Sequence, residues 1–231
     1  MKISGLDIRT AFLTATIDGD VYLRLASDLP LPPRIDGQEE PDGATYWKLK
    51  KTLYGLRRSP NLFNNELHEH LVSGGYIRSD MDQCLYLKRD PITRKLIFFT
   101  VHVDDFAIAS ECSTMTTALH DHIKSRYKID ETDTLEHFIG VNISYRIEDD
   151  KEWMYLSQPA FLDKIFKYFN LTDDTVKHPT TPMSSTFNLE SQRDSPRMNQ
   201  REYQQAIGLL LYALRTRPDQ HVICALTLTW N

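Results

Sequence analysis

Two adjacent carboxylates, Asp104 and Asp105, interrupt an otherwise nearly apolar run, FFTVHVDDFAIAS, over residues 98–110. A core admits a carboxylate only where a cation or hydrogen-bond donors compensate the cost of burying its charge. The apolar segments on either side are rich in the β-branched and aromatic residues of strands. The run therefore predicts a β-hairpin with the two acids at its tip, and it requires something that neutralises them.

The segments around this hairpin predict a sheet with helices packed on it. KISGLDI begins as a strand and places Asp7 near its end, and further strands are expected at residues 84–87, 95–103 and 138–145. Helices are expected from Ser59, as the N-cap, to Gly74 in the left-handed C-terminal position, and over residues 113–127. This order predicts an α+β fold: an antiparallel, ferredoxin-like sheet with helices on one face.

The remainder of the chain is predicted to be mainly helical. Residues 153–157 are expected to form a second hairpin with residues 138–145. Earlier in the chain, residues 26–45 are expected to form an irregular excursion. A helix capped by Ser157 follows, with one apolar stripe made of Phe161, Leu162, Ile165, Phe166 and Phe169. A polar linker is expected over residues 172–199, before two helices at roughly 201–215 and 219–230.

Charge is distributed unevenly along the chain. The formal net charge of −5 argues weakly against a protein that coats nucleic acid. Residues 44–64 nevertheless carry five basic side chains and no acidic one: Lys48, Lys50, Lys51, Arg57 and Arg58. A solvated basic loop and a phosphate-binding surface both fit this segment.

Cysteine spacing and hydropathy exclude other classes of protein. The three cysteines are far apart and form no CxxC motif, which argues against a disulfide framework and against a structural zinc site. No apolar run reaches the roughly 18 residues of a membrane span, and the N-terminal segment lacks the apolar core of a signal peptide. We expect an intracellular protein, cytoplasmic or nuclear, with no membrane partner.

The predicted topology brings the carboxylates together. In a ferredoxin-like sheet the end of the first strand lies beside the tip of the central hairpin, so Asp7 is expected next to Asp104 and Asp105. Mg²⁺ or Mn²⁺ is the natural partner of three such groups, because hard cations prefer oxygen ligands. The alternative is a plain hairpin turn, because Asp-Asp on its own is an ordinary pair of turn residues.

Several motifs in order along the chain resemble the reverse transcriptase domain of copia-type LTR retrotransposons. LDIRTAFL resembles the first carboxylate motif, WKLKKTLYGLRRSPNLF the K-x-L-Y-G-L segment, and FFTVHVDDFAIAS the Y-V-D-D hairpin. HFIGVNISY, YLSQPAFLDKIFKYFNL, TTPM and YQQAIGLLLYALRTRPD resemble the blocks downstream. Together these blocks cover nearly the whole chain.

The resemblance implies a polymerase palm with a remnant of the fingers over residues 1–145, and a primer-grip hairpin with a helical, thumb-like segment over residues 146–231. The implied activity is RNA-directed DNA polymerisation with two Mg²⁺ or Mn²⁺ ions. Asp7, Asp104 and Asp105 would be the catalytic, metal-binding carboxylates, with the Ile8 carbonyl as a minor ligand. The implied partners are an RNA/DNA template-primer, deoxynucleotides and other parts of a retroelement polyprotein, in a virus-like particle or the nucleus.

The same resemblance implies residues that bind substrate. The incoming nucleotide would contact Thr10, Ala11, Phe12, Tyr54 and Gly55, with the Phe12 ring beneath the sugar, where it excludes a 2′-hydroxyl; an ordinary core aromatic fits Phe12 equally well. Nucleic acid would contact Lys48, Lys50, Lys51, Arg57, Arg58 and His102. Residues 138–145 and the following hairpin would hold the primer strand.

The sequence departs from the family pattern at several positions. His102 stands where the family has Tyr before V-D-D, and Arg58 replaces a frequent Gln. Met1 lies only six residues before Asp7, so we expect the family's upstream fingers to be missing, and no RNase H segment is recognisable. The alternative to an active polymerase is a non-catalytic, truncated retroelement remnant.

Overall fold

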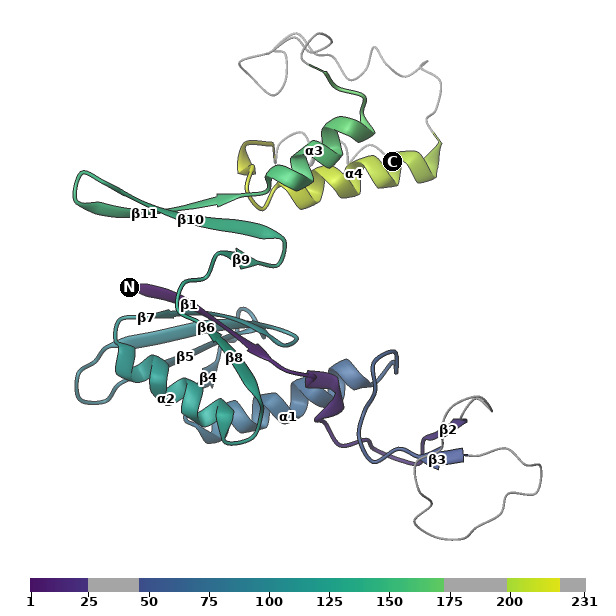
Figure 1. The fold of residues 1–231 in the computed structure, drawn as a ribbon, viewed down its shortest axis with the longest axis vertical. Helices are drawn as coiled ribbons and strands as arrows, with labels where there is room; N and C mark the ends of the chain where they lie inside the picture. Colours follow the sequence, from purple (N-terminus) through teal and green to yellow (C-terminus); the bar gives the residue numbers. More distant parts are fainter. Residues whose placement is uncertain (25–45, 173–198, 221–231) are drawn as a thin grey trace. The chain divides into compact units, whose positions relative to one another are not determined.

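The computed structural model describes residues 1–24, 46–172 and 199–220 (Figure 1). It divides into two compact units, Met1–Leu135 and Glu136–Asn231. The excursion expected at residues 26–45, most of the linker expected at 172–199 and nearly all of the helix expected at 219–230 lie outside the described residues.

A six-stranded antiparallel sheet with the order β4-β5-β6-β7-β1-β8 forms the first unit. Its strands are β1 (Lys2–Ile8), β4 (Ile77–Arg78), β5 (Leu85–Arg89), β6 (Leu96–His102), β7 (Asp105–Ser110) and β8 (Ile129–Thr132). Helices α1 (Ser59–Ser73) and α2 (Ser113–Lys124) cover the same face of this sheet (Figure 1). The short helix η1 (Ala11–Leu13) and the small sheet of β2 (Tyr22–Arg24) and β3 (Tyr46–Lys48) complete the unit.

The connections confirm the predicted α+β fold of antiparallel strands with helices on one face. Taken in chain order, β1, α1, β6, β7, α2 and β8 give the spatial order β6-β7-β1-β8 of a ferredoxin-like sheet, and β4 and β5 extend its edge. The identity of the last strand was predicted wrongly. Ile129–Thr132 pairs with β1, whereas residues 138–145 lie in the second unit.

Period-2 alternation separates the core from the carboxylates. Leu6 and Ile8 are buried on the helix-covered side, so Asp7 between them lies on the opposite face. Phe106 is buried likewise, and Asp105 before it is exposed. Helical spacing supplies the other half of the core, from α1 and α2: Phe63, Leu67, Leu71, Leu119 and Ile123.

Both ends of α1 differ from the sequence prediction. Arg58 occupies the N-cap position, and the Ser59 hydroxyl donates a hydrogen bond to the Leu53 carbonyl (2.7 Å). Gly74 has φ −78°, and the left-handed residue is Gly75, with φ 79°. Gly74 is required for space instead, because a Cβ there would lie 2.6 Å from the His122 ring of α2.

The second unit contains a hairpin and two packed helices. Its sheet has the order β11-β10-β9, formed by β9 (His137–Phe138), β10 (Val141–Glu148) and β11 (Lys151–Ser157). Helices α3 (Pro159–Tyr168) and α4 (Gln200–Ala213) follow, with the short η3 (Pro218–Gln220). Since β10 pairs with β11 from Asn142 to Glu148, a division at residue 145 would cut a paired strand.

Two details of this unit correct the sequence prediction. Ser157 is the last residue of β11, and Gln158 takes the N-cap position of α3. Of the predicted apolar stripe, Ile165 is buried, but Phe166 and Phe169 are exposed.

Among the described residues, no helix is both long enough and apolar enough to cross a bilayer.

Candidate active site

The β6–β7 hairpin ends in a two-residue turn beside the carboxylates. His102 pairs with Asp105, so Val103 and Asp104 occupy the two central turn positions. Val103 has φ 62°, a left-handed conformation that a β-branched side chain rarely adopts. The turn therefore holds local backbone strain directly next to Asp104.

Replacing Val103 with glycine should stabilise the folded chain by about 1 kcal/mol, because glycine adopts positive φ without a steric penalty and Val103 is not part of the buried core. Urea denaturation followed by circular dichroism measures the change. Val103→Ile is the matched control, since it keeps the β-branch and should leave stability almost unchanged. Equal stability of all three chains would show that the turn is not strained.

Strand register places the acidic residues in one row across the sheet. Asp7 of β1 lies directly opposite Asp105 of β7 on one side and Asp130 of β8 on the other. Asp104 is tied to the same place by its backbone carbonyl, which accepts a hydrogen bond from the Ile8 N–H (2.9 Å). The three carboxylates predicted from sequence are thus brought together, and a fourth, Asp130, joins them.

The electrostatics of the row reflect this crowding. Partial burial raises the pKa of Asp7 above its ordinary value, and the charges of Asp104 and Asp105 raise it further. The pKa of Asp7 is also raised by Asp130 and lowered by Arg9. Partial burial and Asp104 raise the pKa of Asp105 in the same way. Like charges on facing strands are destabilising, so the excess negative charge of this row disfavours folding.

Arg9 and Asp130 form an ion pair that the sequence did not reveal. The Arg9 guanidinium donates to both carboxylate oxygens of Asp130, and the Nε contact is 2.6 Å. Arg9 lies in the turn directly after β1, where its backbone N–H donates to the Lys128 carbonyl (2.9 Å), and its side chain reaches Asp130, the residue opposite Asp7 on β8. The pair leaves Asp130 neutralised, whereas Asp7, Asp104 and Asp105 form no ion pair in the described part of the chain.

The donor atoms at this site suit a hard divalent cation, since they are carboxylate oxygens that repel one another. Their side chains are not arranged around a common point: within residues 1–24, 46–172 and 199–220, no group of three or more His, Cys, Asp or Glu residues could hold a metal ion. The observation that favours a cation is therefore the unbalanced negative charge and the raised pKa of Asp7 and Asp105.

The residues predicted to bind a nucleotide follow β1 directly. Thr10 has φ 53° and turns the chain from β1 into η1, where Ala11 is fully buried. Phe12 packs against the core, and its backbone carbonyl accepts a hydrogen bond from the Thr52 hydroxyl. Thr52, itself fully buried, joins η1 to the segment before α1.

Phe12 is also where the two predicted nucleotide segments meet. Its ring contacts Tyr54 edge-to-face (centroids 5.2 Å apart) and Phe63 of α1 in the same manner (6.0 Å). Tyr54 is 57% exposed, so its ring is available to a ligand. Gly55 has φ 89°, a backbone conformation that favours glycine. A Cβ there would meet nothing within 4 Å, so the backbone angle and not a lack of room for a side chain explains glycine at this position.

The predicted basic residues fall into two groups. Three have partners: Lys48 pairs with Asp20 (2.5 Å), Lys51 donates to the Thr14 carbonyl (2.6 Å), and Arg58 pairs with Asp18. Within the described part of the chain, Lys50 and Arg57 form no ion pair.

His102 lies directly across the strand pair from Asp105 and is exposed. Its charge lowers the pKa of Asp105, against the effects of burial and of Asp104. His102 therefore opposes part of the carboxylate repulsion, which a tyrosine at this position would not do.

Comparison with known proteins gives a consistent result. The family model described as Reverse transcriptase (RNA-dependent DNA polymerase) matches residues 1–185. The chain is 28% identical over 217 residues to the Retrovirus-related Pol polyprotein from transposon RE1 of Arabidopsis thaliana, covering 94% of this chain and 14% of that protein. It is 24% identical over 226 residues to the corresponding polyprotein from transposon TNT 1-94 of Nicotiana tabacum, covering 95% and 16%. The chain thus spans about one seventh of the length of these relatives.

Proposed function

The chain belongs to the reverse transcriptase (RNA-dependent DNA polymerase) family of copia-type retrotransposons, and from this we propose that it carries the nucleotidyl-transfer centre of such an element. The observation that carries the proposal is the register that sets Asp7 opposite Asp105, with Asp104 in the adjoining turn. The centre adds deoxynucleotides to a primer paired with an RNA template.

The first unit acts as the palm, and the hairpin and helices of the second act as primer grip and thumb. The fold of the first unit supports this, since strand alternation puts Asp7 and Asp105 on the sheet face opposite the one that α1 and α2 cover (Figure 1). In the second unit, every residue of β11 is exposed, as expected of a ribbon that lies along a strand of nucleic acid.

Divalent magnesium or manganese fits the donor set of the site. Asp7, Asp104 and Asp105 would hold the ion, with the Ile8 carbonyl as a minor ligand. When bound, it lowers the pKa of the primer 3′-hydroxyl and stabilises charge on the departing pyrophosphate. Partial burial and, after it, repulsion from neighbouring carboxylates raise the pKa of Asp7 and Asp105. This supports the assignment, because a bound cation would offset both effects.

The protein's own groups orient the incoming nucleotide. The backbone amides of Thr10 and Ala11 bind its triphosphate, and the left-handed turn at Thr10 directs the chain there. The Phe12 ring lies beneath the sugar and selects against a 2′-hydroxyl. Its edge contacts with Phe63 and Tyr54 support this role, because a fixed ring excludes an extra oxygen better than a mobile one.

The basic segment and His102 contact nucleic acid. Lys50 and Arg57 are available for phosphates, and Lys48, Lys51 and Arg58 exchange their internal partners for phosphates on binding. His102 lies near the primer terminus. The chain acts as part of a retroelement polyprotein, in a virus-like particle or the nucleus.

Primer extension tests the proposal. The purified chain, given an RNA template, a DNA primer, deoxynucleotides and Mg²⁺, should extend the primer, and Asp104→Asn should abolish extension. Asp121→Asn, an exposed acid on α2, is the control and should extend as the wild type does. Absence of extension by the wild-type chain would favour the non-catalytic remnant.

A further inference from the structure

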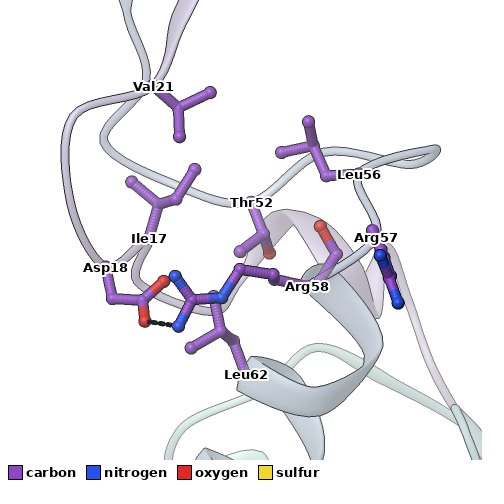
Figure 2. Close-up of a pocket in the computed structure, with 9 residues that line it drawn as sticks. Ile17, Asp18, Val21, Thr52, Leu56, Arg57, Arg58 and Leu62 are labelled. Carbon is purple, nitrogen blue, oxygen red and sulfur yellow. Dashed lines mark hydrogen bonds and ion pairs between the residues drawn. The ribbon is translucent and has the colours of Figure 1, made fainter.

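A pocket of about 130 Å³ lies between the loop that follows η1 and the start of α1 (Figure 2). Four aliphatic side chains line it, two from each segment: Ile17, Val21, Leu56 and Leu62. Pockets that enclose a whole small-molecule ligand have volumes of roughly 300–1,000 Å³. This pocket is less than half as large, so we expect it to hold one ring system of a larger ligand and not a whole ligand.

The polar groups in the pocket wall are already bonded within the protein. The Thr52 hydroxyl donates to the Phe12 carbonyl, and the Thr52 N–H donates to the Ala15 carbonyl (3.0 Å). The Ser59 hydroxyl donates to the Leu53 carbonyl (2.7 Å). The wall thus offers apolar contact and few groups that could read the edge of a ring by hydrogen bonds.

The rim of the pocket is charged. The guanidinium of Arg58 extends to Asp18, with which it forms an ion pair (Figure 2), and the two side chains are 70% and 45% exposed. Arg57 lies next to Arg58 and forms no ion pair among the described residues. An exposed ion pair contributes little stability, so Arg58 can exchange Asp18 for a stronger anion at little cost.

We propose that this pocket holds one unpaired base of a single-stranded nucleic acid, with the adjoining phosphate displacing Asp18 from Arg58. Apolar walls suit the faces of a base, and a guanidinium suits phosphate, to which it bonds in bidentate fashion. Because the wall has few free hydrogen-bonding groups, any base enters. The inference rests on the proposed function, for which the occupant is a base of the template strand.

The assignment gives Asp18 the role of a competitor for Arg58. Without a nucleic acid, Asp18 is ion-paired with Arg58. When a nucleic acid binds, its phosphate must displace the Asp18 carboxylate. Removing the charge of Asp18 should therefore strengthen binding, although Asp18 is itself one of the pocket residues. A residue that merely supported the fold would have the opposite effect.

Fluorescence anisotropy with labelled RNA 12-mers tests the base pocket. The wild-type chain should bind oligouridylate about fivefold to tenfold more tightly than an abasic oligomer of equal length, since the abasic oligomer has no base to bury against the aliphatic wall. Val21→Phe fills the pocket and should bind both oligomers with equal affinity. A base preference that survives in both Val21→Phe and Ile17→Phe would overturn the proposal.

The charge exchange is tested in the same assay. Asp18→Asn should bind oligouridylate about threefold or more tightly than the wild type, whereas Arg58→Ala should weaken binding and reduce the salt slope by about one. The double variant should match Arg58→Ala, because Asp18 acts only through Arg58. Arg89→Ala, on β5, is the control for a general loss of charge.

The two proposals fail in different ways. Unchanged or weaker binding by Asp18→Asn, or no binding of either oligomer by the wild type, would overturn the pocket. If only Asp18→Asn fails to bind more tightly, the proposed polymerase activity, tested by primer extension that depends on Asp104, is not affected. Conversely, a chain that shows the base preference and the effect of Asp18→Asn but does not extend a primer would support the base pocket and contradict the proposed polymerase activity.

Discussion

Replacing Asp7 with asparagine should abolish primer extension and, at the same time, make the folded chain more stable at pH 7. Asp7 is opposed by Asp105 and Asp130 in register, and it is partly buried. Removing its charge relieves repulsion across both neighbouring strands, which is worth about 1 kcal/mol or less. The same change removes one of the carboxylates proposed to hold the catalytic cation. Several kcal/mol of transition-state stabilisation are lost with it, so activity should fall about 10³-fold or more.

The pH dependence of this stability gain follows from the direction of the shift. The pKa of Asp7 is raised above its ordinary value of 3.8, so its neutral form is favoured by folding. The stability that protonation contributes is fully present below pH 3.8 and is lost as pH rises through the folded-state pKa. Asp7→Asn should therefore exceed the wild type in stability at pH 7 and match it below about pH 4.

Urea denaturation at pH 7 and pH 4, together with the extension assay, measures both effects on the same preparations. Asp121→Asn serves again as the control, since it removes an exposed carboxylate of α2, which covers the sheet face opposite the row. Loss of activity together with loss of stability would indicate that Asp7 supports the fold rather than the reaction.

Acidification below pH 6.5 should destabilise the first unit through a pair of histidines between α1 and α2. The rings of His70 and His122 are stacked, with centroids 4.1 Å apart and planes 6° apart. Each Nε2 lies within hydrogen-bond distance of the other residue's backbone carbonyl, at 2.8 and 2.7 Å. Desolvation lowers the pKa of His70, and the charges of His122 and Arg126 lower it further, although the backbone hydrogen bond opposes this.

The sign of the effect is set by this lowered pKa. A neutral His70 is favoured by folding, so its contribution to stability is present above pH 6.5 and is lost as pH falls through the folded-state pKa. Each proton taken up on unfolding reduces the free energy of unfolding by about 1.4 kcal/mol per pH unit. Desolvation lowers the pKa of His120 as well, so that residue adds to the same loss.

Replacing both stacked rings isolates their share. His70→Gln with His122→Gln keeps an N–H donor at each position but removes the titration of His70, so stability should fall less steeply between pH 6.5 and 5 than in the wild type. Denaturation midpoints at pH 5, 6 and 7 measure the slope, and His137→Gln, an exposed site in β9, should retain it in full. Parallel curves for the wild type and the double variant would contradict the prediction.

The sequence was sufficient to predict that the three carboxylates lie together. The apolar segments around Asp104 and Asp105 predict a hairpin with the acids at its tip, and Asp7 was placed near the end of the first strand, as the register confirms. Because ferredoxin-like connections place these strands side by side, their meeting could be predicted without coordinates.

Asp130 and its partner were missed for a physical reason. β8 is four residues long, IDET, too short and too polar to give a period-2 signal, and its strand character comes from pairing with β1. The Arg9–Asp130 contact joins residues 121 positions apart, and nothing in either local sequence selects the other. The Arg58–Asp18 pair across the pocket was unpredictable for the same reason.

The ends of elements failed where a tertiary contact decided them. A Ser-Pro start favours Ser59 as the N-cap, but its hydroxyl bonds to Leu53 instead. Gly74 was read as a left-handed cap, whereas the space it leaves is taken by the His122 ring. The second unit begins at Glu136 because β10 finds its partner in β11, a choice between two possible neighbours that periodicity alone does not make.

The row of acids across β7, β1 and β8 also bears on how the chain reaches its native pairing. A slip of one residue between strands turns every side chain to the other face of the sheet. A slipped β1 would turn Asp7 toward the hydrophobic core under α1 and α2, where an uncompensated charge is most costly. Mispaired sheets are thus selectively unstable during folding, and the residues proposed to catalyse the reaction also ensure that the strands align correctly before any substrate arrives.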